Sequence, residues 1–132
     1  MLSAILITRN EAHNLEDCLA SLKDLADEIV VVDTKSSDDT VAIAQKFGAK
    51  VAQPEDWPGF GPQKNRALAL ATHPWVLSID ADERVTPELA AEINVAIGRA
   101  HKDGNHHDPI TKQFNTYEIP RKSWYCGKFI QY

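Results

Sequence analysis

The alternation of two hydrophobic periodicities along the chain constrains its fold most strongly. Short apolar runs, typical of buried strands, alternate with segments whose apolar residues recur every three or four positions, as on one face of a helix. The predicted strands cover residues 2–9, 28–34, 50–53 and 75–79, and the predicted helices cover 14–25, 38–47, 63–71 and 86–99. Such alternation produces a mostly parallel sheet with helices on both faces. We therefore expect an α/β, Rossmann-like three-layer fold.

Residues at the ends of the predicted segments support this division. Asn14 is a suitable N-cap for the first helix, and Thr86, followed by a proline, is suitable for the fourth. Gly48 is placed to end the second helix, because glycine readily adopts the left-handed conformation found there. Residues 54–62 hold three prolines and two glycines and are expected to form a loop. Residues 116–130 are expected to form strands or a hairpin.

The length and charge of the chain limit what it can bind and where it works. Its 132 residues can bury a sizeable core, and we expect residues 1–132 to form a single domain. The net charge of −5 argues against nucleic acid as a partner, because phosphate binding needs a basic surface. No apolar run is long enough to span a bilayer and no signal peptide is present, so we expect a cytoplasmic location. Cys18 and Cys126 match no zinc or redox spacing, and Cys18 falls on an apolar helical stripe, which predicts a buried free thiol.

Polar residues follow the predicted strands at the points where these strands end. Those after the first strand are Thr8, Asn10 and Glu11, the second strand ends at Asp33, and the fourth runs into Asp80 and Asp82. Ligands of doubly wound sheets bind beyond the carboxyl ends of the strands. We therefore expect these side chains to line one site.

The pair Asp80 and Asp82 suggests a metal site. Both side chains can point the same way if the backbone turns at the small residue Ala81. Such a pair suits a hard divalent cation, which takes oxygen ligands and commonly shares them with substrate phosphates. A cation there would neutralise a diphosphate as the bond to a sugar breaks. The alternative is a turn that caps the helix beginning at Thr86, although the position after an apolar strand favours the metal.

The other polar residues also have two interpretations. Asp33 is either a ligand-binding acid or a cap for the helix that begins near Asp38, and Glu11 can be a solvated loop acid. Lys64 and Arg66 follow a glycine- and proline-rich loop at the start of a helix, where anions bind favourably. A solvated helix face is the alternative for these two cations.

Four stretches of the chain resemble the N-terminal part of family-two inverting glycosyltransferases with the GT-A fold. The stretches are LITRNEAHNLEDCLASL (6–22), EIVVVDTKSSDDTVAIA (28–44), DWPGFGPQKNRALALA (56–71) and VLSIDADERVTPEL (76–89). Their order and separations match the family, and the third stretch narrows the resemblance to the lipopolysaccharide-core glucosyltransferase-like branch. The resemblance runs from Ala4 to about Ile130 and implies a nucleotide-sugar-binding domain.

The resemblance implies roles for the matching residues. The donor-binding residues would be Thr8, Asn10, Glu11, Asp33, Lys64, Asn65, Arg66 and Asp80. Among these, Asp33 would contact the base or ribose, and Asp80 would face the ribose and the metal. Asp82 would be the direct ligand of a divalent cation, Mg²⁺ or Mn²⁺. Apart from the resemblance, the glycines and prolines of the 54–62 loop, which flank Trp57 and Phe60, predict a mobile flap beside the donor. Trp57 is interpreted as a core or loop anchor rather than a sugar platform.

The resemblance also implies an activity. The enzyme would transfer a hexose, glucose in the nearest branch, from a nucleoside diphosphate sugar such as a UDP-sugar, with inversion. The acceptor would be an envelope saccharide such as lipopolysaccharide core, reached by peripheral association with the inner membrane. A donor-binding module with no or weak transferase activity is the alternative. A phosphoryl-receiver domain is disfavoured, because its acids and lysine would lie on other strands.

Two departures from the family pattern affect this interpretation. Lys35 stands where the family usually has a glycine, so the turn near Asp33 can differ. The family usually continues beyond Gly127 into an acceptor-binding region that carries the general base, whereas this chain ends soon after. Glu83 and Glu118 are the candidates for the base that the sequence offers, and Glu83 is better interpreted as a structural neighbour of the metal site.

Overall fold

The computed structural model describes residues 1–98, 118–119, 122–125 and 128–131. It contains two compact units, Met1–Lys102 and Asp103–Tyr132. In the second unit, β5 (Lys122–Tyr125) and β6 (Lys128–Gln131) form an antiparallel pair, which confirms the hairpin predicted there. Cys126 lies outside the described residues. The single domain over residues 1–132 stays a prediction.

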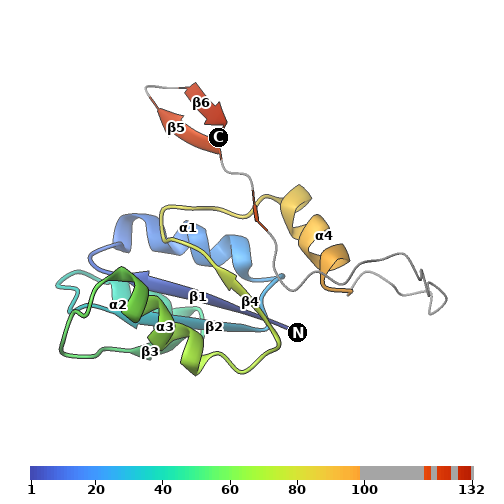
Figure 1. The fold of residues 1–132 in the computed structure, drawn as a ribbon. Helices are drawn as coiled ribbons and strands as arrows, with labels where there is room; N and C mark the ends of the chain where they lie inside the picture. Colours follow the sequence, from blue (N-terminus) through green and yellow to red (C-terminus); the bar gives the residue numbers. More distant parts are fainter. Residues whose placement is uncertain (99–117, 120–121, 126–127, 132) are drawn as a thin grey trace. The chain divides into compact units, whose positions relative to one another are not determined.

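A four-stranded parallel sheet forms the centre of the first unit (Figure 1). Its strands, in spatial order, are β3 (Lys50–Ala52), β2 (Glu28–Asp33), β1 (Leu2–Thr8) and β4 (Trp75–Ser78). Thr8 is paired with Asp33, and Ile5 with Ser78. The carboxyl ends of the strands therefore meet at one edge of the sheet, as predicted.

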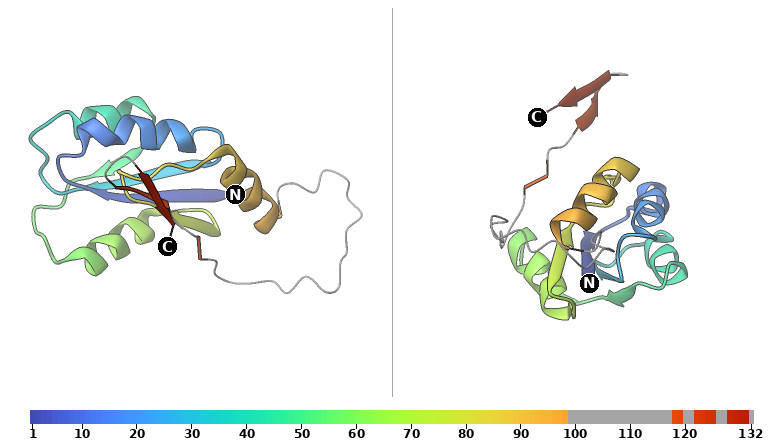
Figure 2. Two further views of the ribbon diagram at one scale, coloured as in Figure 1. Left: turned by 90° about the horizontal axis from the view of Figure 1, so that it is seen from above. Right: turned by 90° about the vertical axis from the view of Figure 1, so that its right-hand side faces the viewer.

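Helices cover both faces of this sheet (Figure 2). On one face lie α1 (Ala12–Leu22) and α2 (Thr40–Lys46), and on the other lies α3 (Phe60–Leu70). The last helix of the unit, α4 (Pro87–Ala96), follows the segment after β4. These three layers confirm the predicted α/β fold.

The core has a layer on each face of the sheet. On the α1 side the predicted apolar stripe is fully buried and consists of Leu15, Cys18, Leu19 and Leu22. On the α3 side, the buried residues that pack together are Ile5, Val30, Val32 and Ala67. Each buried leucine contributes roughly 2 kcal/mol of hydrophobic stabilisation. This packing fixes the register that aligns the ends of the strands.

The first helix begins earlier than its sequence predicts. Asn14 was expected as the N-cap, but α1 starts at Ala12 and Asn14 lies inside its first turn. The free amide groups at that end are bound by residues at the start of α2. The Ala12 amide donates to Asp38 Oδ2 at 3.2 Å, and the Glu11 amide donates to Thr40 Oγ1 at 2.9 Å. The cap therefore comes from another part of the chain, which local sequence does not reveal.

The ends of the other helices follow local rules more closely. Gly48 has φ 77° just after α2, as expected for a residue that ends a helix. Thr86 caps α4, since its Oγ1 accepts the Leu89 amide at 3.1 Å. In contrast, α3 starts at Phe60 rather than Gln63, because a proline is tolerated in the first turn of a helix. No helix in the described part of the chain is long and apolar enough to cross a membrane.

Candidate functional site

β4 leads directly into an acidic turn at the carboxyl edge of the sheet. The Ile79 amide donates to the Ile5 carbonyl at 3.2 Å, so the chain stays beside β1 just beyond the strand. The Glu83 amide then donates to the Asp80 carbonyl at 2.9 Å. This closes a turn around Ala81, which is buried. The backbone turn predicted between the two aspartates is therefore present.

Three carboxylates gather on this turn, and we call them the acidic cluster: Asp80, Asp82 and Glu83. Each offers one carboxylate oxygen, and these three oxygens lie within 4.8 Å of one another. Ligand oxygens around an octahedral Mg²⁺ lie roughly 3–4 Å apart, so small side-chain rotations would bring all three onto one ion. Hard oxygen donors of this kind fit Mg²⁺ or Mn²⁺. The alternative role as a cap is not observed, because Thr86 itself caps α4.

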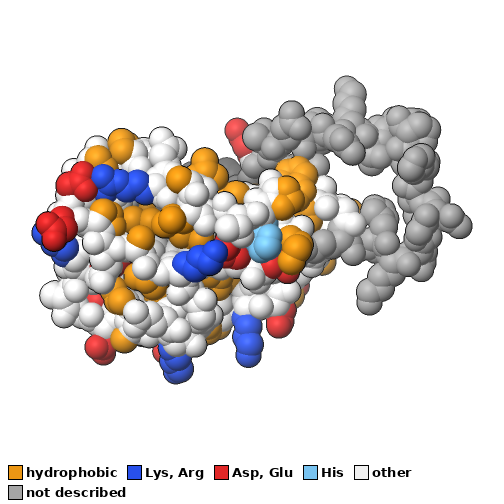
Figure 3. Space-filling model, turned by 90° about the horizontal axis from the view of Figure 1, so that it is seen from below, with side chains coloured by type: hydrophobic (Ala, Val, Ile, Leu, Met, Phe, Trp, Pro, Cys, Tyr) orange, Lys and Arg blue, Asp and Glu red, His pale blue; other side chains and the backbone are white. Residues whose placement is uncertain are grey.

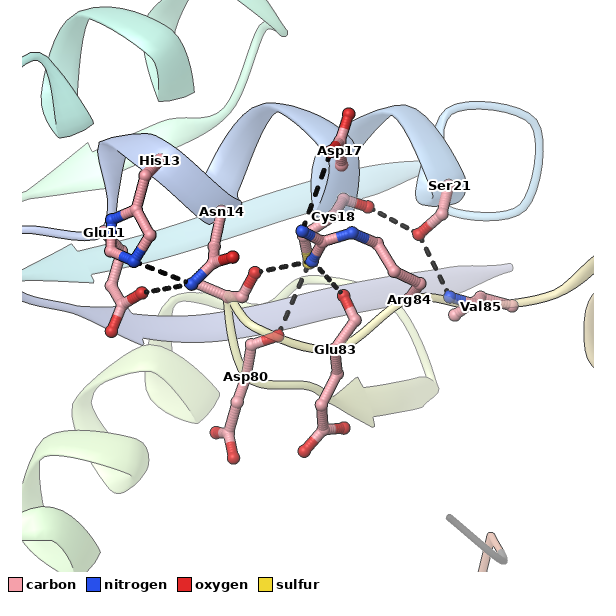
Figure 4. Close-up of polar contacts among 11 residues, drawn as sticks. Glu11, His13, Asn14, Asp17, Cys18, Ser21, Asp80, Glu83, Arg84 and Val85 are labelled. Carbon is pink, nitrogen blue, oxygen red and sulfur yellow. Dashed lines mark hydrogen bonds and ion pairs between the residues drawn. The ribbon is translucent and has the colours of Figure 1, made fainter. Parts of the chain in front are cut away.

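Helix α1 holds the backbone of the acidic turn from behind (Figure 4). The Cys18 thiol donates to the Asp80 carbonyl at 3.5 Å, and Ser21 Oγ accepts the Val85 amide at 3.1 Å. Ser21 in turn donates to the Cys18 carbonyl at 2.6 Å. The carboxylates of Asp80 and Glu83 point away from α1, toward the open side of the turn (Figure 4). Contacts with α1 thus fix the backbone of the acidic turn and leave the carboxylates of Asp80 and Glu83 on the side away from α1.

Arg84 also organises the turn through main-chain contacts. Its guanidinium donates to the carbonyls of Ala81 and Glu83 at 2.9 and 2.8 Å. It also lies 3.9 Å from Asp17 Oδ2 on α1. Sequence reasoning missed the positioning roles of Arg84 and Ser21. The position of Arg84 directly after three acids was a usable signal, whereas nothing marks Ser21.

The buried thiol predicted for Cys18 is confirmed. Cys18 is fully buried and unpaired with another cysteine. Burial raises its pKa to about 12, because a thiolate would lose its hydration there. The group is therefore a neutral thiol at physiological pH and can donate its hydrogen to Asp80.

Asp33 is the last residue of β2, at the same carboxyl edge of the sheet, and its side chain is fully buried. Its Oδ1 accepts from Thr8 Oγ1 at 2.8 Å and from Ser36 Oγ at 2.5 Å. Its Oδ2 accepts from the Ser36 amide at 2.9 Å and from Gln53 Nε2 at 3.4 Å. Asp33 therefore organises the turn after β2 and joins Thr8 across the two strand ends. It does not cap α2, because its hydrogen bonds go to Ser36, before the helix begins at Thr40.

Asn10 and Glu11 link the loop after β1 to the loop after β2. Asn10 Oδ1 accepts the Ser37 amide at 2.8 Å, and the Asn10 amide donates to Ser36 Oγ at 2.8 Å. Asn10 has φ 51°, a conformation that asparagine adopts more readily than most residues. The Glu11 carboxylate accepts from Asn14 at 3.4 Å. Asn10 and Glu11 thus stabilise the loops at the carboxyl edge of the sheet.

Lys35 shows how the chain accommodates the departure from the family pattern. It adopts φ 45°, the left-handed region that glycine occupies without penalty. A lysine in this conformation is less stable by about 1 kcal/mol. The side chains of Asp33 and Ser36 hold the turn in place nevertheless. The glycine-like conformation is therefore retained.

The three candidates on α3 separate in the structure. Lys64 Nζ donates to Ser78 Oγ at 2.7 Å and lies 3.4 Å from Asp80 Oδ1. Arg66 instead forms a two-pronged contact with Asp56, at 2.9 and 2.8 Å from its two carboxylate oxygens. Asn65 is exposed. Only Lys64 of this group therefore contacts the acidic cluster.

The sequence matches the model of glycosyl transferase family 2 over residues 3–131. The chain belongs to glycosyltransferase family 2. Its parallel sheet with helices on both faces agrees with the GT-A structures that it resembles.

Relatives of this family 2 chain are considerably longer. An uncharacterized glycosyltransferase of Rickettsia conorii is 44% identical over 102 residues, which cover 77% of this chain and 36% of the relative. The lipopolysaccharide core biosynthesis glycosyltransferase LpsC of Rhizobium meliloti is 38% identical over 109 residues, with 74% of this chain and 40% of LpsC covered. The chain thus spans less than half of the length of these relatives.

Two solved structures are similar to this chain in fold. TarS 1–349 of S. aureus is 32% identical with a TM-score of 0.65, over 76% of this chain and 33% of TarS. Glucosyl-3-phosphoglycerate synthase of Mycobacterium tuberculosis is 26% identical with a TM-score of 0.59, over 74% of this chain and 38% of the synthase. That synthase was crystallised with Mn²⁺, UDP and glucosyl-3-phosphoglycerate.

The candidates for the general base lie in different units of the family 2 chain. Glu83 belongs to the acidic cluster. Glu118 belongs to the second unit, where it is exposed.

Proposed function

We propose that this chain forms the donor-binding part of a metal-dependent glycosyltransferase that uses a UDP-sugar. The observation that carries the proposal is the acidic cluster at the carboxyl edge of the sheet, with the Lys64 ammonium 3.4 Å from Asp80 Oδ1. A divalent cation shared by carboxylates and a diphosphate is the usual arrangement for such a set of oxygen ligands. The synthase crystallised with Mn²⁺ and UDP supports the same chemistry.

Residues of the cluster would hold Mg²⁺ or Mn²⁺, with Asp82 as the direct ligand. When bound, the cation would neutralise the diphosphate as the bond to the sugar breaks. Lys64 would add a positive charge beside the same phosphates, and Asp80 would face both the ribose and the cation. Asn65 and Arg66 belong to the donor-binding set through their position on α3, although Arg66 would act by holding Asp56.

The nucleoside would lie over the edge formed by β1 and β2. Asp33 and Thr8 form its floor through their 2.8 Å hydrogen bond, and Asn10 with Glu11 form its wall. A buried carboxylate whose oxygens are already bound can hold the pocket in shape before the ligand arrives. This preorganisation lowers the entropy that binding must overcome.

Transfer with inversion needs a base near the acceptor hydroxyl. A carboxylate that binds a cation is a poor base, because the positive charge lowers its proton affinity. We therefore assign no base role to the cluster, Glu83 included. The transferred sugar would be a hexose such as glucose and the acceptor an envelope saccharide such as lipopolysaccharide core, as the similarity to LpsC suggests. An enzyme with such an acceptor would be expected in the cytoplasm, attached peripherally to the inner membrane.

Calorimetric titration tests the donor and metal parts of the proposal. UDP and UDP-glucose should bind the wild-type chain in the presence of Mn²⁺ and much more weakly in EDTA. Asp82→Ala should weaken UDP binding about 100-fold in Mn²⁺, equivalent to about 2.7 kcal/mol, and change it little in EDTA. Asp24→Asn, at an exposed position on the loop after α1, is the matched control and should bind like the wild type.

The same titrations contain the outcome that contradicts the proposal. Equal affinity for UDP with Mn²⁺ and with EDTA, in wild type and variant alike, would exclude the metal site. Tight binding of UDP-glucose without sugar transfer to saccharide acceptors would favour the donor-binding module over the complete enzyme.

A further inference from the structure

An exposed aromatic pair lies at the start of α3. Trp57 is 47% exposed and Phe60 is 76% exposed, so neither side chain is part of the core. Their ring centroids are 5.1 Å apart and the planes meet at 88°, an edge-to-face arrangement. Trp57 was expected to anchor the loop, and instead it packs on Phe60 at the surface. Two rings held together in water present an apolar surface suited to a ligand.

The segment that carries the pair is fixed at both ends. On one side, Arg66 binds both carboxylate oxygens of Asp56 and also lies 3.4 Å from the Asp56 carbonyl. The Arg66 guanidinium lowers the pKa of the Asp56 carboxyl. On the other side, Gly59 has φ 107° and its carbonyl accepts the Gln63 amide at 3.1 Å. These contacts involve the backbone and side chains on either side of the aromatic pair. The mobile flap expected for residues 54–62 stays a prediction.

Helix geometry sets the pair beside the acidic cluster. Phe60 and Lys64 are four residues apart on α3, so they lie on one face with Cβ atoms about 5–6 Å apart. Lys64 in turn lies 3.4 Å from Asp80 Oδ1. The aromatic surface is thus one helical turn away from the residue that contacts the cluster. We therefore expect a ligand bound at the cluster to extend toward the rings.

Charge decides which ligand the aromatic surface fits. Glu55 flanks it as an exposed acid beside the ion pair of Asp56 and Arg66, and the chain carries a net charge of −5. Apolar and charged side chains lie close together at the surface of the unit, as one face shows in Figure 3. Anionic lipid headgroups attract basic segments, so an acidic rim disfavours a membrane. A saccharide ring is neutral, with one apolar C–H face and a rim of hydroxyl groups.

We propose that Trp57 and Phe60 form a stacking surface for a saccharide ring at the edge of the donor site. The C–H face of the sugar packs on the rings, and its hydroxyl groups meet the acids at the rim. The inference rests on the proposed function, since that function supplies the sugar. The ring can belong to the donor hexose or to the acceptor, and both share this chemistry.

The test measures nucleotide and saccharide binding separately in the full chain. UDP with Mn²⁺ is titrated first, then UDP-glucose with Mn²⁺, and then methyl glucoside and a methyl heptoside by saturation-transfer NMR in the presence of UDP and Mn²⁺. Trp57→Ala and Phe60→Ala should weaken sugar binding about 10-fold, measured either as the affinity for the methyl glycosides or as the affinity for UDP-glucose relative to UDP. The affinity for UDP itself should be unchanged. Trp57→Phe should keep most of the binding. Leu68→Ala, at another exposed apolar position of α3, is the control and should have no effect.

The arms of the test distinguish the source of the sugar. Loss confined to UDP-glucose assigns the surface to the donor hexose, and loss confined to the methyl glycosides assigns it to the acceptor. The proposal is overturned if sugar binding is unchanged in both alanine variants while UDP still binds. It is also overturned if Trp57 is needed only for binding to vesicles of anionic phospholipid. If UDP fails to bind the wild type with Mn²⁺, the proposed function falls first and this inference falls with it.

Discussion

The two ends of the parallel sheet use carboxylates in opposite ways. At the amino end, Glu28 is 8% exposed and accepts hydrogen bonds from Ser3, Thr72 and Lys50. At the carboxyl end, Asp80 is 52% exposed and shares its turn with two further acids. An acid surrounded by donors holds strands together. Several acids gathered on one turn would instead suit a cation as ligands.

A hollow at the amino end sharpens this contrast. It has a volume of about 280 Å³, and its lining includes Glu28, Lys50 and His73. Its central acid is already bound to Lys50. At the carboxyl end three carboxylates share one turn with a single neighbouring ammonium, that of Lys64. This local excess of acids, rather than the depth of a hollow, indicates where a metal ion and a diphosphate would bind.

The largest effect that tests the comparison is expected at the amino end. Glu28→Gln removes the charge that Lys50 binds and should lower the free energy of unfolding by about 2 kcal/mol at pH 7, after allowance for screening of the exposed lysine. Urea denaturation measures it. Glu16→Gln is the matched control, because Glu16 makes only a 3.8 Å exposed pair with Lys46. A change no larger than that of the control would contradict the structural role of Glu28.

The pH dependence of the same variant follows from its pKa. The Lys50 ammonium, with the Thr72 and Ser3 donors, lowers the pKa of Glu28 from 4.5 to about 2. The stabilisation is therefore fully present above pH 4.5 and is lost as the pH falls from 4.5 toward 2. The difference in unfolding free energy between wild type and Glu28→Gln should shrink across this window. A difference that stays constant down to pH 2 would show that the charge is not its source.

An intermediate effect is expected at the carboxyl end. Glu83→Gln should weaken Mn²⁺ binding about 10-fold, or about 1.4 kcal/mol, because one of the three carboxylate charges beside the ion is lost. Thermal stability should stay the same or rise, since repulsion within the cluster decreases. Electron paramagnetic resonance of free Mn²⁺ measures the first quantity and calorimetry the second. Glu88→Gln, an exposed acid of α4, is the control. Unchanged Mn²⁺ affinity would remove Glu83 from the ligand set.

The smallest effect concerns the backbone of the carboxyl end. Lys35→Gly should raise the free energy of unfolding by about 0.5–1 kcal/mol, because glycine adopts φ 45° without the penalty that lysine incurs. Chemical denaturation resolves a change of this size, with Lys46→Gly in α2 as a control that should destabilise. A loss of stability in Lys35→Gly would show that the lysine side chain contributes more than its backbone conformation costs.

The sheet and the meeting of acids at its carboxyl edge could be predicted because both depend on local patterns. Strand and helix periods are visible in the residues themselves, and the ends of parallel strands fall together. The start of α1 could not be predicted, because Asp38 and Thr40 supply its cap from 26 and 29 residues away. The partner of Arg66 could not be predicted either, because it binds Asp56, ten residues earlier. Partners of long side chains depend on the packed fold and leave no periodic trace.

The strand order has a consequence for how the protein is made. β1 leaves the ribosome first, yet it lies between β2 and β4, and its second neighbour is Trp75–Ser78. At about 5–20 residues per second, several seconds pass before that neighbour is synthesised. During this interval one edge of β1 has no strand beside it. The acidic turn follows β4 directly, so the acidic cluster is synthesised only when the other three strands of the sheet are already available to pair.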